Sequence, residues 1–403
     1  MFRFACSKRM RTCATLSSEV TQHPKIYLAL TDDWELRGNG SGDVSQLQFD
    51  PLKQLLSIYR QYGVRSTFNV EVMQQLTFRK FQDQYPELQR LADEWDDHVR
   101  EAFKQGQDIQ LHIHPQWSQA HYENEKWKLS GEWSLLNYDA DSAWAMLSES
   151  KEYLEDLLRP IDPAYRCVSF RSGSSCIAPS SFALDLLARL GIVFDMSIVG
   201  GLRVNTAHVK IDYTHCEEGF LPFYPRMTDA RKVSDKPESI VCVPIFHFYL
   251  SRYRAFRQTL SKTWHKAGQR MTARGTGNGD DNYANQEWAE IGRTSAHARI
   301  YDKAIKPCLA GKYEVGDTSR LDYGGLREML DAIRAMARAS GFQELPVILT
   351  SHSKYIKDYD AIEQFVREVS SADDIEFATL GQLATKLQAG EFPIKVGSAQ
   401  NAV

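Results

Sequence analysis

The sequence lacks the features that mark several large classes of protein. It has no run of about 18 apolar residues, so no transmembrane segment is predicted. Its seven cysteines, at positions 6, 13, 167, 176, 216, 242 and 308, are odd in number and form no C-x-x-C pair. This excludes a zinc-finger framework and a disulfide scaffold. The net charge of -4 gives no indication of a nucleic-acid partner.

A secretion signal is also missing. The first 24 residues carry Arg3, Lys8 and Arg11 against the single acidic residue Glu19, a composition similar to a transit peptide. They contain no apolar segment of the length that a secretory signal needs. A disordered extension and a targeting segment both stay open for residues 1–24. With scattered cysteines and no export signal, the predicted location is cytoplasmic.

What the chain has is the composition of a globular protein. It is 403 residues long, 43% hydrophobic and 25% charged, which is enough for a large core without disulfides. We predict one domain over residues 25–390, followed by a tail over 391–403. A flexible insertion is predicted near 265–295, where glycine, asparagine and aspartate dominate the sequence.

Strand-like and helix-like segments alternate along this domain. Short apolar runs predict buried strands, and amphipathic stretches between them, several closed by a glycine, predict helices. The predicted strands cover residues 25–31, 66–72, 108–114, 167–170, 192–194, 240–246 and 346–350, and the predicted helices 51–62, 86–104, 142–158, 180–190 and 326–339. This order predicts an α/β fold, a distorted (β/α) barrel of seven or eight strands that forms a single catalytic domain.

Polar residues follow four of these strands at their carboxyl ends, where barrel enzymes place their active sites. They are Asp32 and Asp33, the pair His112 and His114, and further on Arg171 and His352. Residues at i and i+2 of a strand project to the same side, so the two histidines can share one metal ion with a carboxylate from a neighbouring strand. Each feature alone is more often structural, but together they predict one shared site.

Five short motifs, in order, resemble those of the polysaccharide deacetylases, carbohydrate esterase family four. They are LALTDD at 28–33, STFNV at 66–70, GQDIQLHIHP at 106–115, SFRSG at 169–173 with LGIVFDMS at 190–197, and VILTSH at 347–352. The resemblance spans about residues 25–385. It implies a metal-dependent hydrolase on a (β/α) barrel.

The resemblance also implies roles for individual residues. Asp32 matches the general base, with Arg171 beside it, and His352 matches the group that protonates the leaving amine. Asp195 is expected to orient Arg171 or His352. The family's arginine motif usually contains a tryptophan that is absent here, where Cys176 lies near its place.

One divalent metal ion is the implied cofactor, and zinc is the predicted ion. Asp33 and His112 match two of its ligands. The family's second histidine lies four residues after the first, where this chain has Gln116. His114 is therefore the predicted third ligand, because strand geometry sets it beside His112; ligation by Gln116 stays open.

The predicted function is removal of N-acetyl groups from an amino sugar in a glycan. Trp117 and Tyr224, which fall in predicted loops after strands, are the predicted substrate-binding residues. Two alternatives stay open: a small-molecule amidohydrolase on the same barrel, and a glycan-binding relative without catalytic activity. The sequence leaves the oligomeric state open.

Overall fold

The computed structural model describes residues 24–206, 209–256 and 311–397. The insertion predicted near 265–295 lies outside these ranges. So do residues 1–23 of the predicted N-terminal extension and the last six residues of the tail. The domain boundaries stay predictions.

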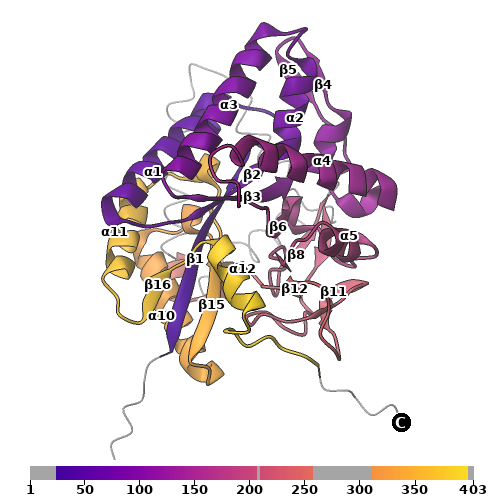
Figure 1. Ribbon diagram of the computed structural model, residues 1–403. Helices are drawn as coiled ribbons and strands as arrows, with labels where there is room; N and C mark the ends of the chain where they lie inside the picture. Colours follow the sequence, from indigo (N-terminus) through magenta and orange to yellow (C-terminus); the bar gives the residue numbers. More distant parts are fainter. Residues whose placement is uncertain (1–23, 207–208, 257–310, 398–403) are drawn as a thin grey trace, which may run out of the picture.

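One sheet forms the centre of the molecule (Figure 1), and every strand pair in it is parallel. Its order is β12-β7-β6-β3-β2-β1-β15, and β16 pairs with the first half of β1. The strands are β1 (Lys25–Trp34), β2 (Thr67–Glu71), β3 (Asp108–Ile113), β6 (Ser169–Ser172), β7 (Phe194–Asp195), β12 (Val241–Cys242), β15 (Glu344–Leu349) and β16 (Ile375–Phe377).

The two edges of this sheet approach each other. Beyond β12, Ile245 forms a parallel bridge with Ile348 of β15, and the N–H of Phe246 donates to the Ile348 carbonyl at 2.9 Å. The sheet therefore curls into a distorted barrel. The predicted fold class is confirmed.

Helices surround this sheet in Figure 1. They are α1 (Asp50–Tyr62), α2 (Val72–Phe81), α3 (Pro86–Lys104), α4 (Ala140–Leu158), α5 (Ala183–Arg189), α10 (Tyr323–Ser340), α11 (Tyr359–Ser370) and α12 (Leu380–Gln388). The sequence predicts five of them and misses α2, α11 and α12. The helix α1 ends where expected, because Gly63 adopts the left-handed conformation with φ of 66° that closes a helix.

Antiparallel hairpins and single-turn helices fill the connections. The hairpin strands are β4 (His121–Glu123) with β5 (Lys126–Lys128), β8 (Arg203–Asn205) with β9 (Lys210–Asp212), and β10 (Pro225–Arg226) with β11 (Asp229–Val233). A fourth antiparallel pair joins β13 (His247–Leu250) to β14 (Lys312–Val315), which lies much further along the chain. The short helical turns are η1 (Ser45–Phe49), η2 (Pro115–Gln119), η3 (Leu135–Asn137), η4 (Gly173–Ser175), η6 (Thr318–Arg320) and η7 (Ser353–Tyr355). Every helix within the described ranges is too short or too polar to cross a bilayer.

Side chains of β1 alternate between two hydrophobic cores. Leu28 and Leu30 belong to the large core that the outer helices cover, whereas Tyr27 and Ala29 belong to a smaller core inside the barrel. The helix α12 contributes its apolar side chains to this inner core at the amino-terminal end of β1. Alternation continues toward the carboxyl end, so the strand sends every second side chain into the barrel. This alternation decides which polar residues of β1 point into the barrel.

Candidate active site and metal centre

The inward side chains at the carboxyl end of β1 and just beyond it are Asp33 and Glu35. They continue the row of Tyr27, Ala29 and Thr31 at a spacing of two. Trp34 lies between them and points the other way, into the outer core against Phe49 and Trp95. Both carboxylates are buried and line a single cavity. Two acidic groups thus enter the barrel side by side.

Glu35 lies at the centre of a group of potential metal ligands. Its Oε2 is 3.2 Å from Nε2 of His112 and also contacts Nε2 of His114. These three residues and Glu71, at the end of β2, each offer a ligand atom, and the four atoms all lie within 4.8 Å of one another. All four side chains are buried. This His/Glu cluster can hold a metal ion.

The hydrogen bonds around the two histidines fit a metal site. Nδ1 of His112 lies 2.8 Å from the backbone carbonyl of Arg171, which accepts a hydrogen bond from that nitrogen. The lone pair of Nε2 then points into the cluster, as a metal ligand requires. Nε2 of His114 is buried and faces the same Glu35 oxygen. The chemistry of the donor set, two imidazoles and one or two carboxylates, suits zinc and related divalent ions.

Gln116 lies on the far side of the His114 ring. Its side-chain nitrogen is 2.9 Å from Nδ1 of His114, the nitrogen turned away from Glu35, and donates to the carbonyl of Gly38 at 3.1 Å. Gln116 therefore holds the ring from behind. His114, and not Gln116, is therefore the residue that reaches the cluster.

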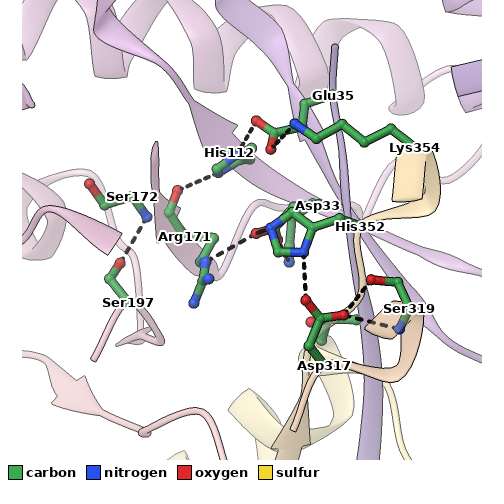
Figure 2. Close-up of polar contacts among 12 residues, drawn as sticks. Asp33, Glu35, His112, Arg171, Ser172, Ser197, Asp317, Ser319, His352 and Lys354 are labelled. Atoms are coloured by element: carbon green, nitrogen blue, oxygen red, sulfur yellow. Dashed lines mark hydrogen bonds and ion pairs between the residues drawn. The ribbon is translucent and has the colours of Figure 1, made fainter. Parts of the chain in front are cut away.

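A buried lysine compensates the charge of Glu35. Nζ of Lys354 lies 2.8 Å from Oε1 of Glu35 and donates to the Leu36 carbonyl at 2.8 Å (Figure 2). Burial opposes ionisation of Glu35, but the neighbouring His114 and the charge of Lys354 hold its pKa well below the usual value. Glu35 is therefore a carboxylate, which is the form that binds a metal.

Asp33 forms a second group with partners from three other strands or strand ends. Nε of Arg171 lies 3.2 Å from its Oδ2, the Asn69 amide donates to its Oδ1 at 3.0 Å, and Nε2 of His352 is 3.6 Å from Oδ2. Burial opposes ionisation, but the charges of Arg171, His112 and His352 outweigh it and lower the pKa of Asp33. Asp33 is thus an ionised carboxylate beside a histidine.

His352 is held by a carboxylate that the sequence analysis does not identify. Nδ1 of His352 lies 3.2 Å from Oδ2 of Asp317, and Figure 2 shows the imidazole between Asp33 and Asp317. Asp317 follows β14 and forms a parallel bridge with Thr350, two residues before His352. Burial would raise the pKa of Asp317, but His352 and Arg320 hold it well below the usual range. The predicted partner, Asp195, instead accepts hydrogen bonds from Ser197.

The two groups open into one cavity of about 220 Å³. Eight of the polar side chains described above line it: Asp33, Glu35, His112, His114, Arg171, Asp317, His352 and Lys354. Another wall of the cavity is aliphatic. Among the described residues that line the whole cavity, Tyr355 is the one Phe, Tyr or Trp. The aliphatic wall comes from the loop after β7 and from the β8–β9 hairpin: Val199, Leu202, Val204 and Ile211.

Three predicted site residues lie outside this lining. Asp32 points to the outer side of β1, where Ser351 and Ser353 flank its carboxyl. Trp117 is buried in an aromatic cluster with Phe78 and Trp127, and Tyr224 packs against the inner core. The remaining predicted residues, Asp33, His112, His114, Arg171 and His352, all line the cavity.

Replacing Asp32 with asparagine is expected to preserve activity and to stabilise the protein at alkaline pH. Burial raises the pKa of Asp32 to about 7, against the effect of the nearby serine hydroxyls. A carboxyl whose pKa is higher in the folded state favours folding while protonated, and this contribution is lost as the pH rises from about 4 to about 7. The variant should gain up to roughly 4 kcal/mol over the wild type above pH 8. Urea unfolding at pH 5 and pH 8 measures the difference; an equal gain at both values would contradict it.

Comparisons with known proteins agree with this fold. A protein from Parabacteroides distasonis assigned as a glycoside hydrolase/deacetylase superposes with a TM-score of 0.51 at 13% identity, covering 92% of this chain and 73% of that one. A Mycobacterium smegmatis protein assigned as a polysaccharide deacetylase has a TM-score of 0.49 at 14% identity, with 94% and 96% covered. Puue allantoinase has a TM-score of 0.44 at 11% identity, with 91% of each chain covered.

No protein-family model matches the chain, and no curated protein matches its sequence. At 13% identity, the likeness to the Parabacteroides protein establishes the fold. The predicted resemblance is therefore confirmed at the level of the deacetylase-type barrel.

Proposed function

We propose that the protein is a metal-dependent hydrolase that removes N-acetyl groups from an amino sugar in a glycan. One observation carries the proposal: a His/Glu cluster that can hold a metal ion shares a cavity with an ionised aspartate and a carboxylate-bound histidine. Amide hydrolysis needs these three elements, because the acyl carbon must be activated, a water deprotonated and the leaving amine protonated.

Glu35, His112 and His114 are the proposed metal ligands. Two imidazoles and one carboxylate, with a position left for water or substrate, are the donor set of many catalytic zinc sites, so zinc is the proposed ion. When bound, such an ion lowers the pKa of a coordinated water and polarises the amide carbonyl. The motif resemblance assigns the ligand role to Asp33; the proposal moves it two residues on, to Glu35, which contacts both histidines.

Asp33 is the proposed general base, in place of Asp32. Its Oδ2 lies in the cavity between Arg171 and His352, and the group is ionised, which is the form that can accept a proton from the attacking water. Arg171 also donates to the Met196 carbonyl at 3.0 Å, which fixes the guanidinium against Asp33. The water oxygen forms the new bond to the acyl carbon as its proton passes to Asp33.

His352 is the proposed general acid. Asp317 accepts the hydrogen bond from Nδ1 and turns Nε2 toward the cavity. From there Nε2 donates a proton to the amine nitrogen as the carbon–nitrogen bond breaks. The products are acetate and the free amino sugar, and Asp317 stabilises the charged imidazolium between turnovers.

A small-molecule amidohydrolase is the second candidate function. The observation that favours it is the aliphatic wall of the cavity, together with a lining in which Tyr355 is the one Phe, Tyr or Trp among the described residues. A glycan usually rests on several aromatic rings. An aliphatic wall also suits the carbon skeleton of a small amide.

A cytoplasmic location stays part of the proposal. Cys167, Cys176, Cys216 and Cys242 are free thiols, and three of them are buried. Free thiols agree with a reducing compartment.

Metal removal should abolish acetate release, and zinc should restore it. Protein stripped with a chelator and protein reconstituted with one equivalent of Zn²⁺ are compared on N-acetylglucosamine oligomers and on a panel of small N-acyl amides and ureides. Release of acetate from the oligomers by the reconstituted protein alone supports the deacetylase. Turnover of a small amide alone would favour the second candidate. Metal uptake with no turnover of any compound would leave the glycan-binding alternative.

A further inference from the structure

Glu71 is a buried carboxylate with one unused oxygen. It ends β2 and is 1% exposed. Its Oε1 accepts a hydrogen bond from the Gln74 backbone N–H at 3.3 Å, which caps α2. Its Oε2 is fully buried and has no hydrogen-bond partner among the described residues. Leaving a carboxylate oxygen buried and unpaired is costly, so this atom calls for a partner.

Helix capping does not account for the choice of glutamate. Asp, Ser and Thr are the usual capping residues because their short side chains reach the first backbone N–H groups. The other described helices with a side-chain cap use these residues: Ser134, Asp139, Asp317, Asp322, Asp358 and Thr379. Glu71 is longer by one methylene than aspartate, which carries its carboxylate further into the barrel.

The extra length brings Glu71 to the His/Glu cluster. In the sheet Glu71 is the register partner of His112, and β2 and β3 are adjacent. Its ligand atom lies within 4.8 Å of those of Glu35, His112 and His114. A cation at the centre of these atoms would give the unpaired oxygen the partner it lacks.

We propose that Glu71 is a fourth protein ligand of the metal centre. This inference rests on the metal site of the proposed function and extends it. With a cation bound, Glu71 and Glu35 together supply two negative charges, which neutralise a divalent ion inside the barrel. Two carboxylates beside two imidazoles make the site richer in oxygen than a three-histidine site, which favours harder ions such as Mn²⁺ alongside Zn²⁺.

Glu71→Gln tests the role because it separates ligation from capping. The glutamine keeps the length and one oxygen to accept from Gln74, but its amide nitrogen cannot bind a cation. Zn²⁺ affinity is measured by competition with a chromophoric chelator, with Glu101→Gln on the exposed side of α3 as the matched control. Zn²⁺ binding should weaken at least about 10–100-fold in Glu71→Gln, the loss typical even for groups that only orient ligands. Glu101→Gln should bind as the wild type does.

Thermal unfolding with and without Zn²⁺ gives a second readout. The rise in Tm on metal binding increases with the logarithm of the affinity, so a lost ligand reduces this increment, whereas a lost cap lowers Tm equally in both states. Equal Zn²⁺ affinity and an equal increment in wild type and Glu71→Gln would overturn the inference and leave the metal centre standing. A wild type that binds no Zn²⁺ would overturn both.

Discussion

Asp33→Asn is expected to lower kcat by about 10²–10⁴-fold while one equivalent of metal stays bound. The substitution keeps the size of the side chain and an oxygen that can accept from Arg171 or Asn69. It removes the ability to take a proton from water. The proposed metal ligands are Glu35 and the two histidines that it contacts, and Asp33 is not among them. Metal binding should therefore be largely unaffected.

Metal content by elemental analysis and kcat for acetate release decide the outcome together. Asp32→Asn is the matched control, since it makes the same chemical change one residue away on the outer side of β1. If Asp33→Asn loses the metal, Asp33 is a ligand, as the motif resemblance implies. If Asp32→Asn loses activity while Asp33→Asn keeps it, the outer carboxylate is the base and the proposed assignment is wrong.

Strand alternation explains how far the sequence could predict this site. Hydrophobic patterning predicts the order of the strands and identifies the polar residues at their carboxyl ends. The barrel fold and the location of the site could therefore be predicted. The i, i+2 argument that pairs His112 with His114 applies equally to Asp33 and Glu35. The motif resemblance directs attention to the adjacent aspartates instead, and adjacent residues on a strand face opposite sides.

The end of β1 is the local feature that the sequence does not reveal. The apolar run stops at Leu30, which predicts a strand ending at Thr31, yet β1 continues to Trp34 because residues 31–34 pair with β2. Tertiary pairing therefore extends the strand through polar residues. The extension sets Asp33 and the following Glu35 in the inward row.

Asp317 and Trp117 illustrate contacts that no local pattern encodes. Asp317 meets His352 because the chain after β14 bridges to Thr350, a pairing between segments far apart in the sequence. Its own surroundings resemble an ordinary capping turn, and it does cap η6 through Ser319. Trp117 follows a strand, as a residue at the mouth of the cavity would, but its ring packs against neighbouring aromatic rings in the core. Composition alone does not distinguish the two environments.

Glu35→Gln is expected to abolish both metal binding and activity. Oε2 of Glu35 contacts Nε2 of both His112 and His114, so the carboxylate is placed to share a cation with the two rings. The amide of glutamine offers a weaker, neutral oxygen. Elemental analysis should find less than a tenth of an equivalent of zinc after dialysis, and acetate release should fall to background.

Stability complicates this variant, because Glu35 is also the counterion of Lys354. The lysine side chain is 4% exposed, and removing one partner of a buried ion pair typically costs about 3–5 kcal/mol. A partly unfolded Glu35→Gln variant would lose the metal because the site is no longer folded, whether or not Glu35 is a ligand. The double variant Glu35→Gln with Lys354→Met removes the unpaired charge as well, and Lys354→Met alone is its control.

The comparison among these three variants isolates the ligand role. If Glu35 binds the metal, the double variant should recover most of the Tm lost by Glu35→Gln and still bind no zinc, whereas Lys354→Met retains zinc. If the double variant regains a full equivalent of zinc, Glu35 serves only to neutralise Lys354, and the carboxylate of the site must come from elsewhere. Asp33 and Glu71 also interact electrostatically with His112. They are then the next carboxylates to test as metal ligands.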